Sequence, residues 1–222
     1  MEVVIRRILT VLALIGFVPL AMADELLGPV NIKDKTPFSL GAAIIYKDKP
    51  YRSYDDDEKW QAAPLIIFEG ERFYFRGNSF GWKFVNQDDF EISVRAEVRT
   101  DGYDSGDSPV LIGMDDRDPT LDGGVAMTWR PGGGAFSLDM TAVHDLTDEY
   151  DGYEVRAGAG YVTAVGAWAL RLGAHAVFQS DDLVDYYYGV RASEALPGRP
   201  AYSADEETNF RLQAITAYRF GE

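Results

Sequence analysis

The chain has 222 residues, no cysteine and a formal net charge of −15 at pH 7. This length allows one domain, and the lack of cysteine excludes disulfide bonds and a lipid anchor on cysteine. The acidic balance argues against nucleic acid as a partner, because its phosphates would repel the chain.

Residues 1–23 have the features of a secretory signal peptide. Arg6 and Arg7 precede an apolar run, and Ala21-Met22-Ala23 places small residues at the cleavage positions. The run of about 15 residues is shorter than the ~20 that a transmembrane helix needs. We therefore expect cleavage near Ala23 and one mature domain, 24–222, with an uncleaved anchor as the alternative.

A two-residue alternation dominates the mature chain. In FEISVRAEVR (90–99), Phe90, Ile92, Val94, Ala96 and Val98 share one face, and polar or charged residues share the other. The same pattern recurs along the sequence. It predicts ten strands, at 38–47, 62–69, 71–85, 89–99, 120–130, 134–144, 153–163, 167–178, 183–190 and 208–220.

In two segments the assignment depends on more than the alternation. The stretch RGNS (76–79) is also compatible with a turn that splits 71–85, but the even strand number of bacterial barrels favours one strand. In the strand expected at 183–190, Tyr186 and Tyr188 would face lipid at the headgroup level, next to a loop that begins at Arg191.

Alternation of this kind occurs in soluble β-sandwiches and, inverted, in membrane barrels. The segments have the length of about 9 to 11 residues that a tilted strand needs to cross a bilayer. Aromatic residues mark strand ends, as in the pairs Phe38 with Tyr46, Tyr153 with Tyr161 and Trp168 with Phe178. We therefore predict an all-β, antiparallel up-and-down transmembrane β-barrel of about ten strands, ten to twelve, with the sandwich as the alternative.

The connecting segments are polar and acidic. Those at 47–59, 101–109 and 197–207 have the length of extracellular loops, whereas 69–70 and 131–134 are typical of short turns. The polar strand faces carry both charge signs, which predicts a lumen filled by ion pairs and at most weak conductance. This luminal set is Glu91, Arg95, Glu97, Arg99, Asp139, Glu154, Arg156, Arg171 and Arg211.

Several stretches resemble the MltA-interacting protein family, also called MipA/OmpV. They are YYYGVRASEALPGRPAY (186–202), KDKPYRSYDDDEKWQAAPLIIFEGERFYF (47–75), and LIGMDD followed by DGGVAMTW (111–129). The resemblance implies an outer-membrane barrel of a Gram-negative bacterium. It also implies a scaffold that joins a lytic transglycosylase to a bifunctional peptidoglycan synthase, or a porin-like protein or adhesin. Family members usually continue through more strands beyond the RPAY stretch, whereas this chain ends on Gly221-Glu222 after Phe220.

The sequence offers weak support for catalysis. A lipase-like set would combine His144 with Ser137 and with Asp139 or Asp145, but Ser137 and Asp139 have the parity opposite to that of His144. The other histidine, His175, has luminal parity and is expected in a hydrogen-bond network near Arg171. We therefore predict no catalytic residues and no enzyme activity.

Acidic clusters suggest calcium, but their spacing does not fit an EF-hand loop. Solvated loops explain them better. We therefore predict no metal site, no cofactor site and no bound cofactor. The clusters are Asp55, Asp56, Asp57 and Glu58; Asp101, Asp104 and Asp107; and Asp115, Asp116 and Asp118.

The predicted function is that of a non-enzymatic envelope scaffold. The expected partners are outer-membrane lipid and lipopolysaccharide, and the two peptidoglycan enzymes that the resemblance implies. A narrow porin or surface adhesin is the first alternative, and a lipid-modifying barrel enzyme is the second.

Overall fold

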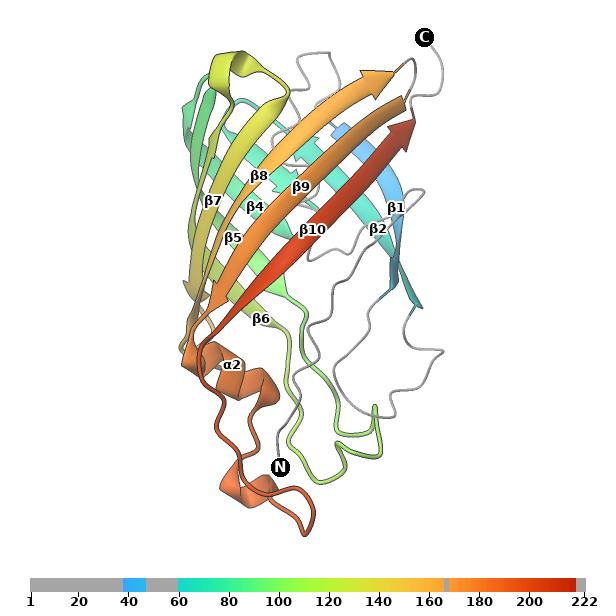
Figure 1. Ribbon diagram of the computed structural model, residues 1–222, viewed down its shortest axis with the longest axis vertical. Helices are drawn as coiled ribbons and strands as arrows, with labels where there is room; N and C mark the ends of the chain where they lie inside the picture. Colours follow the sequence, from blue (N-terminus) through green and yellow to red (C-terminus); the bar gives the residue numbers. More distant parts are fainter. Residues whose placement is uncertain (1–37, 47–59, 166–167, 219–222) are drawn as a thin grey trace.

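The computed structural model describes residues 38–46, 60–165 and 168–218, which form one antiparallel sheet of ten strands. Each strand pairs with its neighbours in the chain, so the sheet runs from β1 to β10 without a crossover (Figure 1). This confirms the predicted all-β, up-and-down fold. The strands are β1 (Phe38–Tyr46), β2 (Trp60–Glu69), β3 (Phe73–Arg76), β4 (Ser79–Asn86), β5 (Phe90–Arg99), β6 (Thr120–Trp129), β7 (Phe136–Asp145), β8 (Tyr153–Val165), β9 (Trp168–Gln179) and β10 (Glu207–Tyr218).

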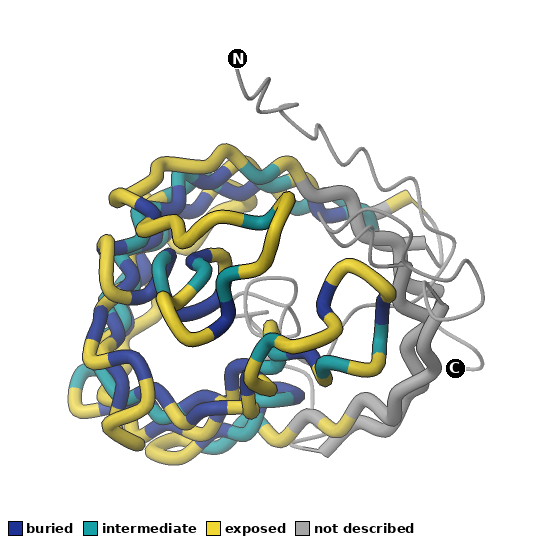
Figure 2. The backbone as a smooth tube through the Cα atoms, turned by 90° about the horizontal axis from the view of Figure 1, so that it is seen from below, coloured by how far each residue is buried: buried dark blue, intermediate teal, exposed yellow. Residues whose placement is uncertain are grey.

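The sheet curves around a central space, and connecting segments fold across its end (Figure 2). β1 and β10 are the two edge strands of the described sheet. Among the described residues, no helix combines the length and the apolarity that a bilayer crossing would need.

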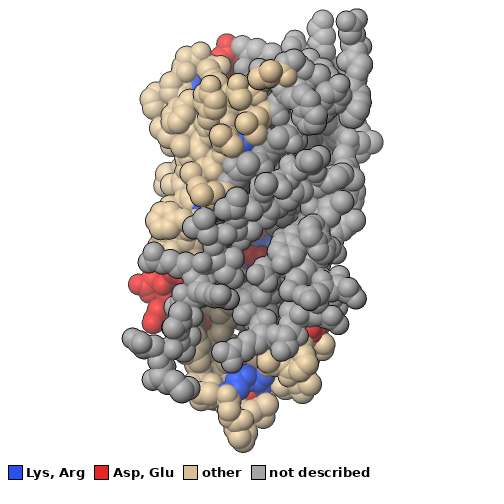
Figure 3. Space-filling view, turned by 45° about the vertical axis from the view of Figure 1, so that its right-hand side comes forward, with Lys and Arg blue, Asp and Glu red and all other residues tan. Residues whose placement is uncertain are grey.

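The wall is polar inside and apolar outside. In β5, Glu91, Arg95 and Arg99 are buried, whereas Val94 and Val98 are 43 % and 40 % exposed. A soluble sandwich would show the reverse, so this inversion indicates a lipid-facing wall. Figure 3 shows the described wall on one side as largely uncharged, with charged side chains gathering toward the lower end.

Aromatic side chains lie on the outer face near strand ends, as the sequence predicted. Tyr153 and Tyr161 of β8 are exposed, and the rings of Tyr153 and Phe178 lie 5.9 Å apart. On β4, the aromatic side chains of Phe80, Trp82 and Phe84 are also exposed. The side chains of Phe38, Tyr46 and Trp168 lie outside the described part of the structure.

The two ends of the sheet differ in the length of their connections. One end carries the segments 100–119 and 180–206 and the shorter 146–152, and we call it the long-loop end, at the bottom of Figure 1. The other end carries the turns 70–72, 87–89 and 130–135, the last of which contains the 3₁₀ turn η3 (Pro131–Gly133). We call this the short-turn end. The predicted loop at 47–59 lies outside the described residues.

The segment predicted as one strand at 71–85 is two strands, β3 and β4. Gly77 has a φ of 67°, a left-handed conformation that glycine adopts without steric cost, and the chain reverses there. Asn78 fixes the turn because its Nδ2 donates to the Val98 carbonyl at 2.8 Å. The resulting hairpin is short, and β3 pairs with β2 along Ile67–Glu69, near the short-turn end.

The strand predicted at 183–190 is instead the helix α2 (Asp181–Tyr188). The Ser180 side chain caps it by accepting from the Leu183 amide, and two aspartates occupy the first turn, where the helix dipole favours negative charge. Leu183, Tyr186 and Tyr187 recur at helical spacing and are buried. The predicted number of ten strands therefore stands because one strand was divided and another was a helix.

Gly81 is expected to be essential for packing inside the lumen. A Cβ atom there would lie 2.2 Å from the ring of the fully buried Tyr74, and the Arg76 guanidinium already lies 3.9 Å from the centroid of that ring. We expect Gly81→Ala to lower the free energy of unfolding by about 1–3 kcal/mol, the usual cost of overpacking. Urea titration of the chain in detergent measures the change, with Gly106→Ala as control because a Cβ at Gly106 meets nothing within 4 Å. Equal midpoints for the two variants would contradict this packing.

Candidate functional site: a charged lumen and its loop cap

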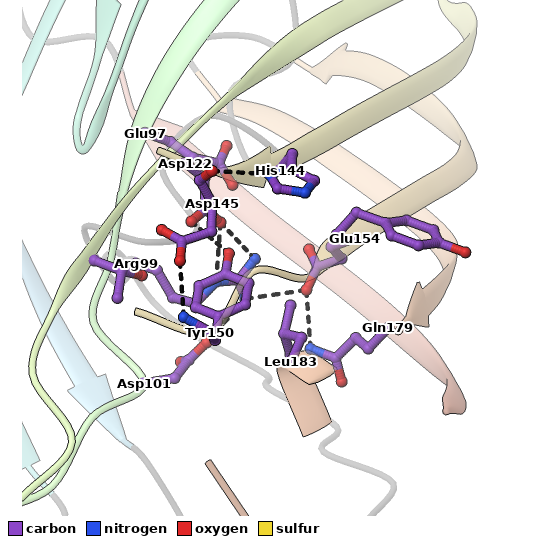
Figure 4. A network of polar contacts seen from close by, with 12 residues as sticks. Glu97, Arg99, Asp101, Asp122, His144, Asp145, Tyr150, Glu154, Gln179 and Leu183 are labelled. Atoms are coloured by element: carbon purple, nitrogen blue, oxygen red, sulfur yellow. Dashed lines mark hydrogen bonds and ion pairs between the residues drawn. The ribbon is translucent and has the colours of Figure 1, made fainter. Parts of the chain in front are cut away.

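A network of buried charges fills the described lumen near the long-loop end. Arg99 of β5 donates to Asp122 Oδ2 of β6 from Nε and Nη2, at 2.9 and 2.7 Å, and to Glu154 Oε2 of β8 from Nη1 at 3.1 Å (Figure 4). Gln179 Nε2 of β9 donates to the same Glu154 oxygen at 2.9 Å. These contacts join four strands through side chains that the lipid does not reach.

The network continues toward the middle of the lumen. Arg156 donates to Glu97 Oε1 at 2.6 Å, and Arg95 pairs with the other oxygen of Glu97. Arg156 Nε also lies 3.2 Å from Glu154 Oε1, which connects this group to the contacts of Arg99. A buried cation is tolerated when carboxylates compensate the cost of its desolvation.

A second group of ion pairs lies near the short-turn end. Arg76 contacts Glu69 at 2.9 Å and Glu91 at 3.2 Å, and Lys83 pairs with the same two carboxylates. The predicted luminal set is confirmed, because its members lie on the inner face of their strands. Among them, Arg171 is 3.8 Å from Asp139, and Arg211 is in register with the buried His175.

Three connections form a compact cover at the long-loop end, which we call the loop cap: residues 100–119, 146–152 and 180–206 (Figure 2). Its central contact joins Arg117 and Glu194. Arg117 Nη2 donates to both Glu194 oxygens at 3.0 and 3.1 Å, and Arg117 Nε donates to the Tyr186 carbonyl at 2.6 Å. The two long loops are therefore locked to each other.

Glu194 is buried and fully engaged. It accepts from the backbone amides of Asp115 at 2.9 Å and Arg191 at 2.8 Å, besides Arg117. Burial alone would raise the pKa of Glu194, but these hydrogen bonds and the charge of Arg117 outweigh it and lower the pKa below its ordinary value of 4.5. Sequence analysis assigned the acidic loop clusters, Asp115 among them, to solvent and did not find the pair of Arg117 and Glu194.

Arg199 ties the tips of the two long loops together. Its guanidinium donates to the carbonyls of Val110 at 2.6 Å, Ile112 at 3.2 Å and Glu194 at 2.8 Å. Arg199 thus holds loop backbone. Arg191, where the sequence placed the start of a loop near lipid headgroups, contacts Asp115 at 3.1 Å.

An apolar cluster lies beneath the locked loops. It contains the side chains of α2 and two residues of other segments: Leu183, Val184, Tyr186, Tyr187, Tyr150 and Ala204. The expectation that Tyr186 faces lipid is therefore wrong, because its ring packs against Tyr187 at 4.8 Å between centroids. Tyr188 is 42 % exposed, but it lies on a helix of the cap and not on a lipid-facing strand.

The cap is bonded to the luminal network. Tyr150 donates its hydroxyl proton to Asp122 Oδ1 at 2.5 Å, while Asp122 Oδ2 holds Arg99. Asp145, at the end of β7, accepts from the amides of Thr147, Glu149 and Tyr150 at 2.7–2.8 Å and so folds the short loop that carries Tyr150. Cap and wall therefore form one connected body.

The residues considered for catalysis do not converge. Ser137 is buried and donates to Asp139 Oδ2 at 3.1 Å on the inner face. The His144 side chain is 53 % exposed, and its Nδ1 lies 2.8 Å from the Asp145 carbonyl. This separation confirms the parity argument, and the predicted lack of catalytic residues stays a prediction.

Two of the acidic clusters organise loop backbone. Asp107 accepts from the Asp104 amide at 3.1 Å, and Asp116 accepts from the Ser105 amide at 2.6 Å. No group of three or more potential metal ligands occurs within the described ranges. The cluster from Asp55 to Glu58 lies outside them, and the predicted lack of a metal site stays a prediction.

Loss of the Arg99 side chain is expected to destabilise the barrel strongly. Arg99→Ala leaves Asp122 and Glu154 buried without their shared cation, which typically costs about 3–5 kcal/mol. Urea unfolding in detergent measures this free energy. Arg72→Ala, in an exposed turn, is the control and should change it by less than about 0.5 kcal/mol. Similar losses in the two variants would rule out a structural role for the network.

The lock between the loops is expected to weaken in acid. Because folding lowers the pKa of Glu194, the ionised carboxylate stabilises the contact between the loops fully above pH 4.5, the ordinary pKa. This stabilisation is lost as the pH falls through the lower pKa of the folded state. Hydrogen exchange, corrected for intrinsic rates, should show falling protection of residues 103–117 and 190–202 below that pH. In Glu194→Gln this protection should be low at every pH, whereas Glu149→Gln, at an exposed site, should behave like the unchanged chain. Protection of Glu194→Gln equal to that of the unchanged chain would refute the assignment.

Comparison with known proteins agrees with this architecture. The chain matches the family model of the MltA-interacting protein MipA over residues 40–222. The putative outer membrane protein YiaT of Escherichia coli (strain K12) is 27 % identical over 221 residues, which cover 98 % of this chain and 83 % of that protein. No solved structure matches the chain.

Two further relatives carry informative names. The MltA-interacting protein of Escherichia coli (strain K12) is 28 % identical over 187 residues, which cover 82 % of this chain and 73 % of that protein. The outer membrane protein OmpV of Vibrio cholerae is 26 % identical over 160 residues, which cover 71 % of this chain and 62 % of that protein. With its inverted strand pattern and its match to the family model, the chain belongs to the MltA-interacting protein MipA family of Gram-negative outer membrane proteins.

Proposed function

We propose that this protein is a non-enzymatic scaffold of the outer membrane that binds a lytic transglycosylase and a bifunctional peptidoglycan synthase. The name of one relative, MltA-interacting protein, supports the first partner. The second partner rests on the family resemblance of the sequence. Cleavage of residues 1–23 would leave 24–222 as the mature domain.

The observation that carries this proposal is the cross-linked lumen. Arg99 and Glu154 belong to strands β5 and β8, on different parts of the wall, and ion pairs of this kind brace the wall from within. The loop cap then covers one end through Arg117 and Glu194. Such a body offers partners a fixed outer shape and not a wide passage.

The short-turn end is the face that we assign to the periplasm, because outer-membrane barrels have short periplasmic turns and longer external loops. Two turns meet on this face, since the Arg130 amide donates to the Asp89 carbonyl at 2.6 Å. Asp88 and Asp89 are exposed beside the exposed Pro131–Gly133 turn. We assign this surface to contact with the periplasmic partners.

A surface adhesin is the second candidate. The tips of the loop cap expose Ile112 at 64 % and Leu196 at 49 %, although Arg199 holds the backbone beneath them in place. Rigidly held apolar side chains at an external tip are suited to contact with another surface.

Partner capture tests the scaffold. The full chain, folded in detergent as judged by a mobility shift between boiled and unboiled gel samples, is immobilised and offered a purified lytic transglycosylase and peptidoglycan synthase. We expect both to be retained, and an Asp88→Lys/Asp89→Lys variant to retain about tenfold less, since reversed charge at an interface costs binding energy. An Ile112→Ser variant, altered at the opposite end, is the control and should bind normally.

Failure of the folded chain to retain either enzyme would refute the scaffold. Binding lost only in Ile112→Ser would place the contact on the loop cap and favour the external role. A conductance of porin size in planar bilayers would contradict the filled lumen.

A further inference from the structure

Arg130 differs from the other luminal charges. It follows β6 and continues the inward-facing series of Asp122 and Thr128, at the short-turn end. The residue is 8 % exposed, and its Nε and Nη1 atoms are buried without a hydrogen-bond partner in the described part of the chain. Buried guanidinium groups are normally paired, so this side chain requires an explanation.

The carboxylates near Arg130 are engaged with other cations. Glu69 and Glu91 each pair with both Arg76 and Lys83. Burial lowers the pKa of Arg130, although Glu91 and Asp139 act in the opposite direction. Within the described ranges, Arg130 is thus a positive charge without a counter-ion of its own.

Asp139 offers the complementary atom. Its Oδ2 accepts from Ser137 and lies 3.8 Å from Arg171 Nη2, but its Oδ1 is buried without a donor among the described residues. Asp139 is in register with Thr128, so Arg130 is its diagonal neighbour on the same inner face. Diagonal neighbours of antiparallel strands lie about 7–8 Å apart, a distance that a small bridging group can span.

We propose that Arg130 and Asp139 form a binding site for a protonated phosphate group at the short-turn mouth of the lumen. The guanidinium fork matches two phosphate oxygens, and the P–O–H group donates to Asp139 Oδ1. Sulfate is fully ionised at neutral pH and has no proton to donate, so its oxygen would oppose the carboxylate. The remaining exposure of Arg130, which is 8 %, provides the open edge of the site.

The test uses the full chain folded in detergent, in a buffer without phosphate. Inorganic phosphate, glycerol phosphate and sulfate are titrated at constant ionic strength, and the midpoint of thermal unfolding is followed by the gel mobility shift. We expect a saturable rise with inorganic phosphate, and sulfate to need about tenfold higher concentration, as for a site built to accept a hydrogen bond from its ligand. A response to inorganic phosphate and not to glycerol phosphate identifies the free ion, and the reverse identifies a monoester.

Three variants locate the effect. Arg130→Gln should abolish the response to phosphate. Asp139→Asn should reduce the preference for phosphate over sulfate, because an amide can donate to either ion, and it also tests the site if Arg130→Gln does not fold. Arg72→Gln, an exposed arginine of a neighbouring turn, should respond like the unchanged chain.

A midpoint that rises equally in the Arg130→Gln variant would overturn the site. Equal responses of the unchanged chain to phosphate and sulfate would overturn the assignment of a protonated phosphate. Neither result bears on whether the chain binds the peptidoglycan enzymes, because that test uses the exposed turns.

Discussion

The structure depends on the need to neutralise charge inside a wall whose outer face is apolar. Strand residues such as Arg99 and Arg156 leave water when the wall forms, and their desolvation is compensated when carboxylates of other strands reach them. Those carboxylates lie far apart in the sequence. The pairing of charges is therefore a condition on how distant strands are placed, as well as a source of stability.

This condition extends from the wall to the loops. Asp122 binds Arg99 through one oxygen and the hydroxyl of Tyr150 through the other, so this strand residue bonds to both the luminal network and the loop cap. Tyr150 packs on the helix α2, and α2 is held in turn by the bond from Arg117 to the Tyr186 carbonyl. Long loops that are charged and rich in glycine and proline thereby acquire defined positions without disulfide bonds.

Much of the fold could be predicted from the sequence, because side-chain alternation in a strand is a local property. The residues of FEISVRAEVR occupy the predicted faces, and the luminal charges follow from the same parity. The division into two strands at Gly77 was harder to predict, because a glycine within an alternating stretch can mark either a bulge or a turn.

The helix α2 and the loop cap could not be predicted from side-chain alternation. Three successive tyrosines fit a strand end as well as a helix, and what decides between them is the burial of Tyr187 against residues of other segments. The pair of Arg117 and Glu194 joins positions 77 residues apart, and no local pattern encodes such a contact. Arg130 had the parity of a luminal residue, but the lack of a described partner for its Nε and Nη1 atoms is visible only once its neighbours are placed.

The short hairpin of β3 and β4 has a consequence for how the wall is assembled. β5 and β6 pair along their whole length, as do β8 and β9 over most of theirs, whereas β2 meets β3 along Ile67–Glu69 in the described sheet. The hairpin of β1 and β2 is thus joined to the other eight strands by a narrow seam. Separation at this seam parts fewer paired residues than separation at any other seam of the described sheet, so the wall can divide into a large folding unit and a small one that docks last.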